Sequence, residues 1–279
     1  TPVSDALMRD YPNTLIHTSG EDVGLPAGVM GNSEVGHQNI GAGRIVDQEV
    51  MRITRAIRDE SFFSKPVIQK SIEHVKASGG TLHLLGLMSD GRVHSDLEHA
   101  FAVVDLVKNA GLASEKFAVH AITDGRDTSP TGGKDFVQQL EDKMAEAGVG
   151  HVASVVGRFY AMDRDLRWER VETAYHMMTQ GAERTAETAS EAIQSYYENP
   201  TDANRKGDEF IAATTIVGPN GPTLVKDGDA IIFLNYRGDR TREITKAFVY
   251  PDDQWKDIEG GGFERGNQIQ NLYFATMTG

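Results

Sequence analysis

The sequence predicts an α/β protein in which a mostly parallel sheet is flanked by helices. Apolar runs of strand length alternate along the chain with amphipathic segments of helix length, the pattern of such a sheet with its covering helices. Charged loops follow four of the apolar runs. Residues 1–47 lack this alternation and are rich in glycine, so we expect them to belong to a separate unit.

Five apolar runs are predicted strands because of their length and composition. They are Thr81–Met88, Phe117–Thr123, Val152–Gly157, Ala230–Tyr236 and Gln270–Thr276. The segment 211–224, IAATTIVGPNGPTL, predicts a further strand, a turn at Pro219, Asn220 and Gly221, and a returning strand.

Helices are predicted from their end signals and from amphipathic spacing. Ser95 and Glu98 form a capping-box pattern, which predicts a helix that begins there and ends at Gly111. Further helices are expected at Val46–Glu60, Lys65–Ala77, Lys134–Ala147, Trp168–Gln180 and Glu187–Glu198. Histidines inside these strands and helices are expected to be structural.

The N-terminal 47 residues contain one short strand candidate, Asn13–His17, and too few apolar residues for a core of their own. A domain boundary is expected near Arg44–Gln48. The first residues, TPVSDALMRDYP, read as a turn with no strand or initiator methionine before it, and the last, NLYFATMTG, stop just after a predicted strand. Both ends are therefore expected to be cut from a longer protein.

Composition excludes several classes of function. The net charge of −13 argues against non-specific binding to nucleic acid or to anionic membranes, because both require a basic face. The absence of cysteine excludes disulfides, thiolate zinc sites and thiol catalysis. No apolar run reaches bilayer length and no leader precedes Thr1, so a soluble cytoplasmic protein is expected.

Charged residues follow four predicted strands, at the ends where open parallel sheets bind ligands. The loops are SDGRVHS with Asp90, Arg92 and His94; DGRDT with Asp124, Arg126 and Asp127; RFYAMDRDLR with Arg158, Asp163, Arg164 and Arg167; and RGDRTR with Arg237, Asp239, Arg240 and Arg242. Guanidinium groups bind carboxylates and phosphates through paired hydrogen bonds, so a small ligand carrying both groups is predicted. The alternative is that these arginines only form surface ion pairs with nearby aspartates.

His94 and Asp127 are the residues in these loops suited to proton transfer. Asp124 is equally suited to capping its turn. Three further aspartates are expected to hold arginines in place: Asp163, Asp165 and Asp239. Gly91 and Gly125 are expected to adopt positive φ in their DGR turns. No HExxH, GxxxxGK or GxGxxG pattern occurs, so zincin, P-loop and dinucleotide sites are not indicated.

Ser33 lies in the glycine-rich stretch GVMGNSEVGHQNIGAGR. It could be a nucleophile, and His37 four residues on could be its base, although a serine needs such a base, a lowered pKa or a metal to react. A turn in which Asn32 and Ser33 cap a helix would need none of this chemistry. The spacing alone leaves these alternatives open.

The stretch GLPAGVMGNSEVGHQNIGAGRIV resembles the phosphoserine motif of the cofactor-independent phosphoglycerate mutases. The segments SDGRVHS, DGRDT, GRFYAMDRDLRWER and NYRGDRTRE match the substrate-binding loops of that family in order, so the resemblance covers essentially the whole chain. The chain departs from the family pattern at Val29, where glutamine is expected, at Arg92, where glycine is common, at Asp96, where histidine is common, and at Gly238, where alanine or proline is usual.

The resemblance implies two domains: residues 1–47 as a fragment of an alkaline-phosphatase-like metal domain and residues 48–279 as a phosphotransferase domain. It implies interconversion of 3-phosphoglycerate and 2-phosphoglycerate through a phosphoserine on Ser33, with Asp127 as a second catalytic residue. The implied substrate ligands are His94, Arg126, Asp127, Arg158, Arg164, Arg237 and Arg240.

The resemblance also implies two manganese ions, with Ser33 as one metal ligand. The remaining ligands of this family come from segments outside this chain, so the chain alone is expected to bind substrate without turnover. A monomer is expected, without nucleic acid or membrane as partner. Two alternatives are a non-catalytic module that binds phosphorylated ligands and a metal-dependent phosphatase of the same superfamily.

Overall fold

The structure, a computed structural model, describes residues 1–218 and 221–278. The chain divides into two compact units, which we call unit 1 (Thr1–Arg52) and unit 2 (from Ile53 onward). The division falls within helix α3 (Glu49–Arg58). None of the helices in the described residues combines the length and the apolar character needed to cross a bilayer.

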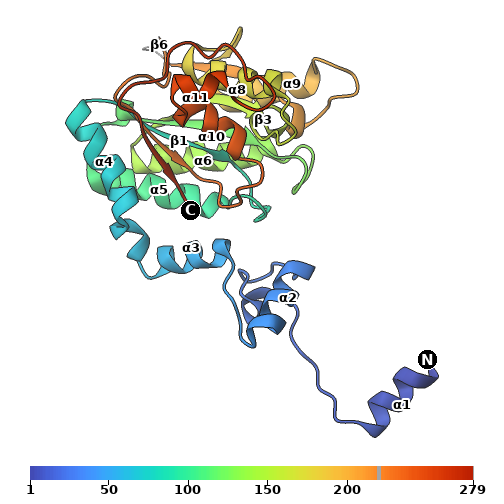
Figure 1. Ribbon diagram of the computed structural model, residues 1–279. Helices are drawn as coiled ribbons and strands as arrows, with labels where there is room; N and C mark the ends of the chain where they lie inside the picture. Colours follow the sequence, from blue (N-terminus) through green and yellow to red (C-terminus); the bar gives the residue numbers. More distant parts are fainter. Residues whose placement is uncertain (219–220, 279) are drawn as a thin grey trace. The chain divides into compact units, whose positions relative to one another are not determined.

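Unit 2 is built on an eight-stranded sheet with the order β4-β5-β3-β2-β1-β7-β8, in which β6 pairs with β5 (Figure 1). The strands are β1 (Leu82–Leu87), β2 (Phe117–Thr123), β3 (His151–Gly157), β4 (Arg184–Ala186), β5 (Thr214–Gly218), β6 (Gly221–Pro222), β7 (Ala230–Phe233) and β8 (Tyr273–Thr276). The neighbours β3, β2, β1, β7 and β8 run parallel, whereas β5 is antiparallel to β3. The predicted α/β fold class is confirmed, and the carboxyl ends of β1, β2, β3 and β7 meet at one edge.

Helices cover both faces of this sheet. They are α4 (Pro66–Ser78), α5 (Leu97–Ala110), α6 (Gly133–Ala147), α7 (Arg158–Ala161), α8 (Trp168–Thr179), α9 (Ala189–Glu198), α10 (Arg242–Val249) and α11 (Asp252–Lys256). In Figure 1, α4, α5 and α6 lie on one side of the sheet, and α8, α10 and α11 lie on the other. The expected strands and helices of unit 2 are confirmed with small differences at their ends, although Pro219 and Asn220 of the predicted turn lie outside the described residues.

The sequence did not predict β4 or α10. Strand β4 has three residues that are mostly exposed, so it carries no apolar run. Helix α10 follows the charged loop RGDRTR directly and is short, but its face with Ile244, Ala247 and Phe248 is buried. A single turn or two of amphipathic helix is too brief to produce a clear periodic signal.

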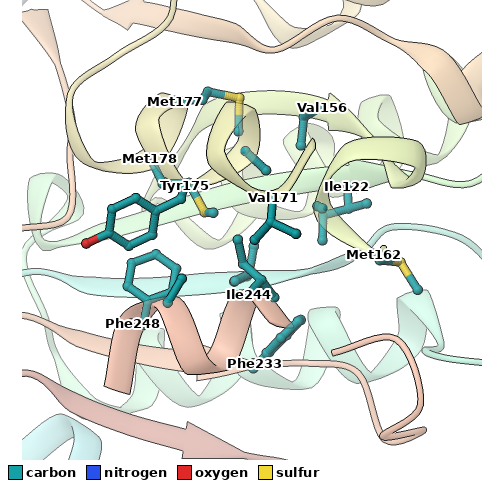
Figure 2. Close-up of a cluster of buried hydrophobic side chains, with 14 of the residues drawn as sticks. Ile122, Val156, Met162, Val171, Tyr175, Met177, Met178, Phe233, Ile244 and Phe248 are labelled. Carbon is teal, nitrogen blue, oxygen red and sulfur yellow. The ribbon is translucent and has the colours of Figure 1, made fainter. Parts of the chain in front are cut away.

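One apolar core of unit 2 lies between the sheet and helices α8 and α10 (Figure 2). Phe233 and Ile122 from the strands face Val171 and Tyr175 of α8, and Phe248 of α10 packs against the Tyr175 ring with 4.9 Å between centroids. Burial of side chains of this size contributes about 1.5–3 kcal/mol each. This packing fixes the sheet edge from which the charged loops emerge.

A buried chain of polar side chains links Asp229, the residue before β7, to β1, β2 and β3. Asp229 accepts from Nε2 of His83 at 3.1 Å, Nδ1 of His83 lies 3.0 Å from Nε2 of His120, and Nδ1 of His120 lies 2.7 Å from the Ser154 hydroxyl. Because the carboxylate can only accept, each imidazole donates toward Asp229 and accepts from the next group, and Ser154 donates last. The His120 ring is neutral in this arrangement, which agrees with burial lowering the pKa of His120 well below its ordinary value.

Asp229 also accepts hydrogen bonds from the backbone N–H groups of Thr81 at 2.7 Å and Lys226 at 2.8 Å. Burial by itself would raise the pKa of Asp229, but the hydrogen bonds from His83 and from these N–H groups outweigh it, and the pKa is lowered. The ionised carboxylate therefore ends the chain and links β7 to β1.

We expect Asp229→Asn to lower the free energy of unfolding by about 3 kcal/mol, because a carboxamide cannot replace a buried anion that accepts three hydrogen bonds. Urea denaturation followed by circular dichroism at pH 7.5 measures the change. Asp253→Asn on the exposed side of α11 is the matched control and should change the value by less than about 0.5 kcal/mol. Equal stability of the two variants would contradict the assignment.

Unit 1 contains α1 (Pro2–Asp10), a 3₁₀ turn at Gly20–Val23 and α2 (Ser33–Ala42). The predicted strand at Asn13–His17 is wrong, because no described strand pairs with that segment, and the stretch predicted as a turn forms α1. None of the side chains of α1 is buried. Most of the large apolar side chains exposed in the described residues belong to unit 1, including Leu15, Ile16, Met30 and Ile40.

Candidate functional site

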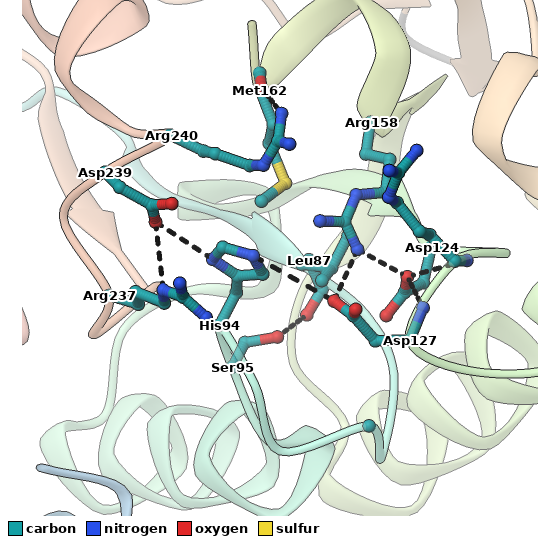
Figure 3. A network of polar contacts seen from close by, with 12 residues as sticks. Leu87, His94, Ser95, Asp124, Asp127, Arg158, Met162, Arg237, Asp239 and Arg240 are labelled. Carbon is teal, nitrogen blue, oxygen red and sulfur yellow. Dashed lines mark hydrogen bonds and ion pairs between the residues drawn. The ribbon is translucent and has the colours of Figure 1, made fainter. Parts of the chain in front are cut away.

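The predicted binding residues of unit 2 gather at the carboxyl edge of its parallel strands (Figure 3). They are His94 after β1, Arg126 and Asp127 after β2, Arg158 and Arg164 after β3, and Arg237 and Arg240 after β7. Arg126, Arg158, Arg164 and Arg240 line one cavity of about 410 Å³. Ser33, the remaining predicted residue, lies in unit 1.

Asp124 is the buried centre of this edge. Its Oδ1 accepts from the N–H groups of Arg126 at 3.1 Å and Asp127 at 2.9 Å and from Nη1 of Arg158 at 2.7 Å, and its Oδ2 accepts from the Ser89 hydroxyl at 2.7 Å. Burial alone would raise the pKa of Asp124, but these hydrogen bonds and the Arg158 charge lower it. The proposal that Asp124 caps its turn is confirmed, and the same carboxylate fixes an arginine from the next strand.

Arg158 is almost fully buried, with 3% of its side chain exposed, and it joins two carboxylates. The same Nη1 that binds Asp124 also donates to Oδ2 of Asp127 at 2.6 Å. Burial would lower the pKa of Arg158, but both aspartates raise it. One buried cation therefore holds the loops after β2 and β3 together, and the bond from Ser89 to Asp124 adds the loop after β1.

His94 lies between two carboxylates without a hydrogen bond to either. Its Nε2 is 3.9 Å from Asp127 and its Nδ1 is 3.8 Å from Asp239, and Nδ1 is buried with no hydrogen-bond partner among the described residues. Burial and the positive charge of Arg158 lower the pKa of His94 to about 4, although the two aspartates oppose this shift. A neutral imidazole with an unused buried nitrogen can donate to, or accept from, a ligand oxygen.

Aspartates hold several of the arginines, as predicted. Asp239 lies 3.2 Å from Nε of Arg237 and 3.0 Å from Nη1 of Arg164. In the loop after β3, Asp163 pairs with Arg170 at 3.1 Å and Asp165 pairs with Arg167 at 3.1 Å. The ion pairs of the alternative interpretation thus exist, but they orient guanidinium groups around a cavity.

Positive charge exceeds negative charge in the cavity lining. Six arginines and three carboxylates line it: Arg126, Arg158, Arg164, Arg167, Arg170 and Arg240 with Asp163, Asp165 and Glu209. Burial, together with the guanidinium groups of Arg164 and Arg158, lowers the pKa of Arg240. An anion with more than one charged group would relieve this repulsion.

The loop after β1 differs from expectation in two details. Gly91 does not have positive φ; Arg92 does, at 56°, whereas Gly125 has the predicted positive φ of 70°. Gly91 is required for space instead, because a Cβ there would lie 3.1 Å from Cβ of Asp127. The predicted capping box of Ser95 and Glu98 is also wrong, because the Ser95 hydroxyl donates to the Leu87 carbonyl. Asp96 is the N-cap of α5 instead, and its side chain accepts from the N–H of Glu98 at 3.1 Å.

Ser33 is the first residue of α2, and the Asn32 side chain caps that helix by accepting from the N–H of Val35 at 3.0 Å. The Ser33 hydroxyl lies 3.2 Å from Nδ1 of His37, which also lies 2.7 Å from the Ser33 carbonyl oxygen. The hydroxyl is exposed, at a helix N-terminus where backbone N–H groups favour an anion.

The described residues contain few side chains that lie together as possible metal ligands. No group of three or more His, Cys, Asp or Glu among them could hold a metal ion. The described residues around Ser33 therefore do not fit a two-manganese centre by themselves.

Comparison with known proteins identifies the family. The family model for the BPG-independent PGAM N-terminus (iPGM_N) matches residues 53–279. This chain belongs to the BPG-independent phosphoglycerate mutase family. It is 71% identical over its whole length to a 2,3-bisphosphoglycerate-independent phosphoglycerate mutase of Rhodopirellula baltica and 48% identical over 99% of its length to one of Clostridium perfringens.

A solved structure of Leishmania mexicana phosphoglycerate mutase, obtained at low cobalt concentration, is similar to 99% of the chain, with a TM-score of 0.80 and 31% identity. The chain covers 52% of the Rhodopirellula protein, 51% of the Clostridium protein and 50% of the Leishmania chain. It thus spans about half the length of the phosphoglycerate mutases that it matches.

Two departures from the pattern of this mutase family contact each other. Nε of Arg92 donates to Oδ2 of Asp96 at 2.9 Å. Arg92, in a left-handed backbone conformation, is thus paired with Asp96, and both are positions where the resemblance leads to an expectation of another residue. The pair is four residues apart in the sequence and closes the loop that carries His94.

The sequence did not indicate the segment 207–211, which contributes Glu209 and Phe210 to the arginine-lined cavity. Asp208 is fully buried, accepts from the Tyr197 hydroxyl and from the N–H of Gly133, and burial raises its pKa to about 6. Glu209 lines the cavity, as does Phe210. The segment follows no predicted strand, so the search for charged residues at strand ends did not include it.

We expect the imidazole of His94 to titrate with a midpoint of about 4 in the NMR spectrum of the folded chain. Because this pKa lies below the ordinary value of 6.5, the folded state binds fewer protons than the unfolded state, and His94 destabilises the fold as the pH falls from 6.5 toward 4. Asp239→Asn should lower the midpoint further, since Asp239 favours the protonated ring. A midpoint at 6.5 would show that the ring is not desolvated.

Proposed function

We propose that this chain binds 3-phosphoglycerate and 2-phosphoglycerate and supplies the substrate-holding part of a protein that interconverts them. The observation that supports this most is the cavity where Arg126, Arg158, Arg164 and Arg240 meet at the carboxyl edge of the parallel strands. Phosphoglycerate carries a carboxylate and, on the first or second carbon from it, a phosphate, and both groups are preferred partners of guanidinium forks.

The proposed substrate ligands divide by position. Arg237 and Arg240 follow β7 and are assigned to the phosphate, with Arg158 and Arg164 as further ligands. His94, Arg126 and Asp127 are assigned to the glycerate part. His94 is suited to this role because its neutral ring offers an unused nitrogen, and Asp127 because its carboxylate can accept a hydroxyl proton.

We infer that Ser33 receives the phosphoryl group in the whole protein. Its Oγ forms a bond to phosphorus while the bond from phosphorus to the ligand oxygen breaks, and the glycerate then takes the group back on its other hydroxyl. In each of the two transfers, Asp127 accepts the proton of the attacking hydroxyl and gives a proton to the oxygen that leaves the phosphorus. Manganese, with Ser33 among its ligands, is proposed for the whole protein, where it would lower the pKa of the serine hydroxyl and neutralise phosphate charge.

We further propose that residues 1–47 are part of an alkaline-phosphatase-like domain and that residues 48–279 form the phosphotransferase domain. The exposed apolar side chains of unit 1 support the first assignment, because they indicate that this unit packs against additional protein. A cytoplasmic monomer whose partner is phosphoglycerate, without nucleic acid or membrane, accords with the acidic composition.

We expect Arg240→Gln to weaken binding of 3-phosphoglycerate to this chain about tenfold or more, because a charge-assisted hydrogen bond to phosphate is lost. Isothermal titration calorimetry at pH 8 measures the dissociation constants. Arg184→Gln, on the exposed edge strand β4, removes the same charge elsewhere and should leave affinity unchanged. Equal affinities of both variants would exclude the cavity as the binding site.

The role of Ser33 can be tested in a protein in which this chain replaces the matching half of the Rhodopirellula baltica relative. That protein should convert 3-phosphoglycerate to 2-phosphoglycerate, and Ser33→Ala should abolish conversion, since no other group replaces the nucleophile. Ser4→Ala in α1 is the control and should remain active. Release of free phosphate without 2-phosphoglycerate would instead identify a phosphatase, and conversion by Ser33→Ala would exclude a phosphoserine at this position.

A further inference from the structure

One carboxylate in the cavity pairs with an arginine that is proposed to bind substrate. Oε1 of Glu209 lies 3.3 Å from Nη1 of Arg126, and both residues line the cavity. The other two lining carboxylates, Asp163 and Asp165, pair with Arg170 and Arg167, which are not assigned to substrate. Glu209 therefore occupies a position where a ligand carboxylate would otherwise meet Arg126.

The backbone of Glu209 is fixed by the ends of β2 and β3. The Thr123 hydroxyl donates to the carbonyl of Asp208 at 2.8 Å, and the N–H of Gly157 donates to the carbonyl of Ile211 at 2.8 Å. A Cβ on Gly125 would lie 2.8 Å from the N–H nitrogen of Glu209, and a Cβ on Gly157 would overlap the Glu209 carbonyl. Because Gly125 and Gly157 have no side chain, the segment with Glu209 has room to lie between the ends of β2 and β3.

The ion pair between Arg126 and Glu209 is held less firmly than the backbone of Glu209. The Arg126 side chain is 58% exposed and the Glu209 side chain is 24% exposed. Arg158, by contrast, is 3% exposed and binds two aspartates, so it cannot exchange partners without leaving buried charges unpaired. Exposed ion pairs contribute little, so a ligand carboxylate with two oxygens can replace Glu209 on Arg126.

We propose that Glu209 is a positioning residue that holds Arg126 in the ligand-free cavity and is displaced from it by the carboxylate of phosphoglycerate. The displacement makes ligand affinity depend on the carboxylate as well as on the phosphate. A phosphate ester without a carboxylate leaves the pair intact and does not compete with Glu209. This inference rests on the proposed function, because it takes Arg126 as a ligand of the glycerate part.

The test compares two ligands that differ only in this group: 3-phosphoglycerate and glycerol 3-phosphate, in which the carboxylate is a hydroxymethyl group. Calorimetry at pH 8 gives the ratio of their dissociation constants for the wild-type chain and for Glu209→Gln. The variant should tighten 3-phosphoglycerate binding about three- to fivefold more than glycerol 3-phosphate binding, the range for loss of one exposed ion pair. Glu146→Gln on the exposed side of α6 carries the same charge change and should leave the ratio unaltered.

A double-mutant cycle assigns the effect to Arg126. In an Arg126→Gln background, Glu209→Gln should no longer change the ratio. An equal gain for both ligands would overturn the inference, because it would mean that Glu209 acts only through the charge of the cavity. A loss of 3-phosphoglycerate affinity would also overturn it.

Glu209→Asp keeps the charge and shortens the side chain, so it serves if Glu209→Gln fails to fold, and it should shift the ratio in the same direction. An unchanged ratio in a chain that binds 3-phosphoglycerate overturns this inference and leaves the proposed function standing. Failure of the folded wild-type chain to bind 3-phosphoglycerate overturns both.

Discussion

The buried contact of Arg158 with Asp124 and Asp127 is the interaction on which the rest of the site depends. One Nη1 atom lies 2.7 Å from one carboxylate and 2.6 Å from the other, in a position with almost no solvent. Removing Arg158 would leave the buried Asp124 carboxylate without its charge partner, which is far more costly than losing an exposed ion pair. Because Asp124 also binds the Ser89 hydroxyl and two N–H groups of its own turn, the contact sets the geometry of three loops at once.

The rigid centre explains why the surrounding groups can remain free for a ligand. His94 is fixed by burial between Asp127 and Asp239 but has no hydrogen bond to either, so its nitrogen is available at little further cost. Arg126, Arg164 and Arg237 are about half exposed, and each pairs with one carboxylate among the described residues. Site residues held by rigid neighbours lose little entropy on binding, and partners that exchange easily keep the arginines oriented before the ligand arrives.

Much of this arrangement could be predicted because it is local in sequence. Parallel strands place residues that follow them at one edge, so Arg126, Arg158 and Arg240 could be grouped without coordinates. The sequence did not place Glu209 in this group, because its position depends on Gly125 after β2 and on Gly157 at the end of β3. The predicted capping box was wrong for a similar reason, because the Ser95 hydroxyl donates to the carbonyl of Leu87 in β1. In unit 1, α1 begins with a proline and is held by local hydrogen bonds, whereas the spacing of its apolar residues did not predict a helix.

The acidic composition of the chain and its arginine cavity are compatible because charges act over different distances. A net charge of −13 repels phosphoglycerate from afar, but at physiological ionic strength the screening length is about 8 Å. Inside the cavity the proposed ligand would be within reach of several guanidinium groups, and partial burial strengthens their attraction relative to bulk water. The local excess of arginine therefore favours a small anion in the cavity, although the net charge of the whole chain is negative.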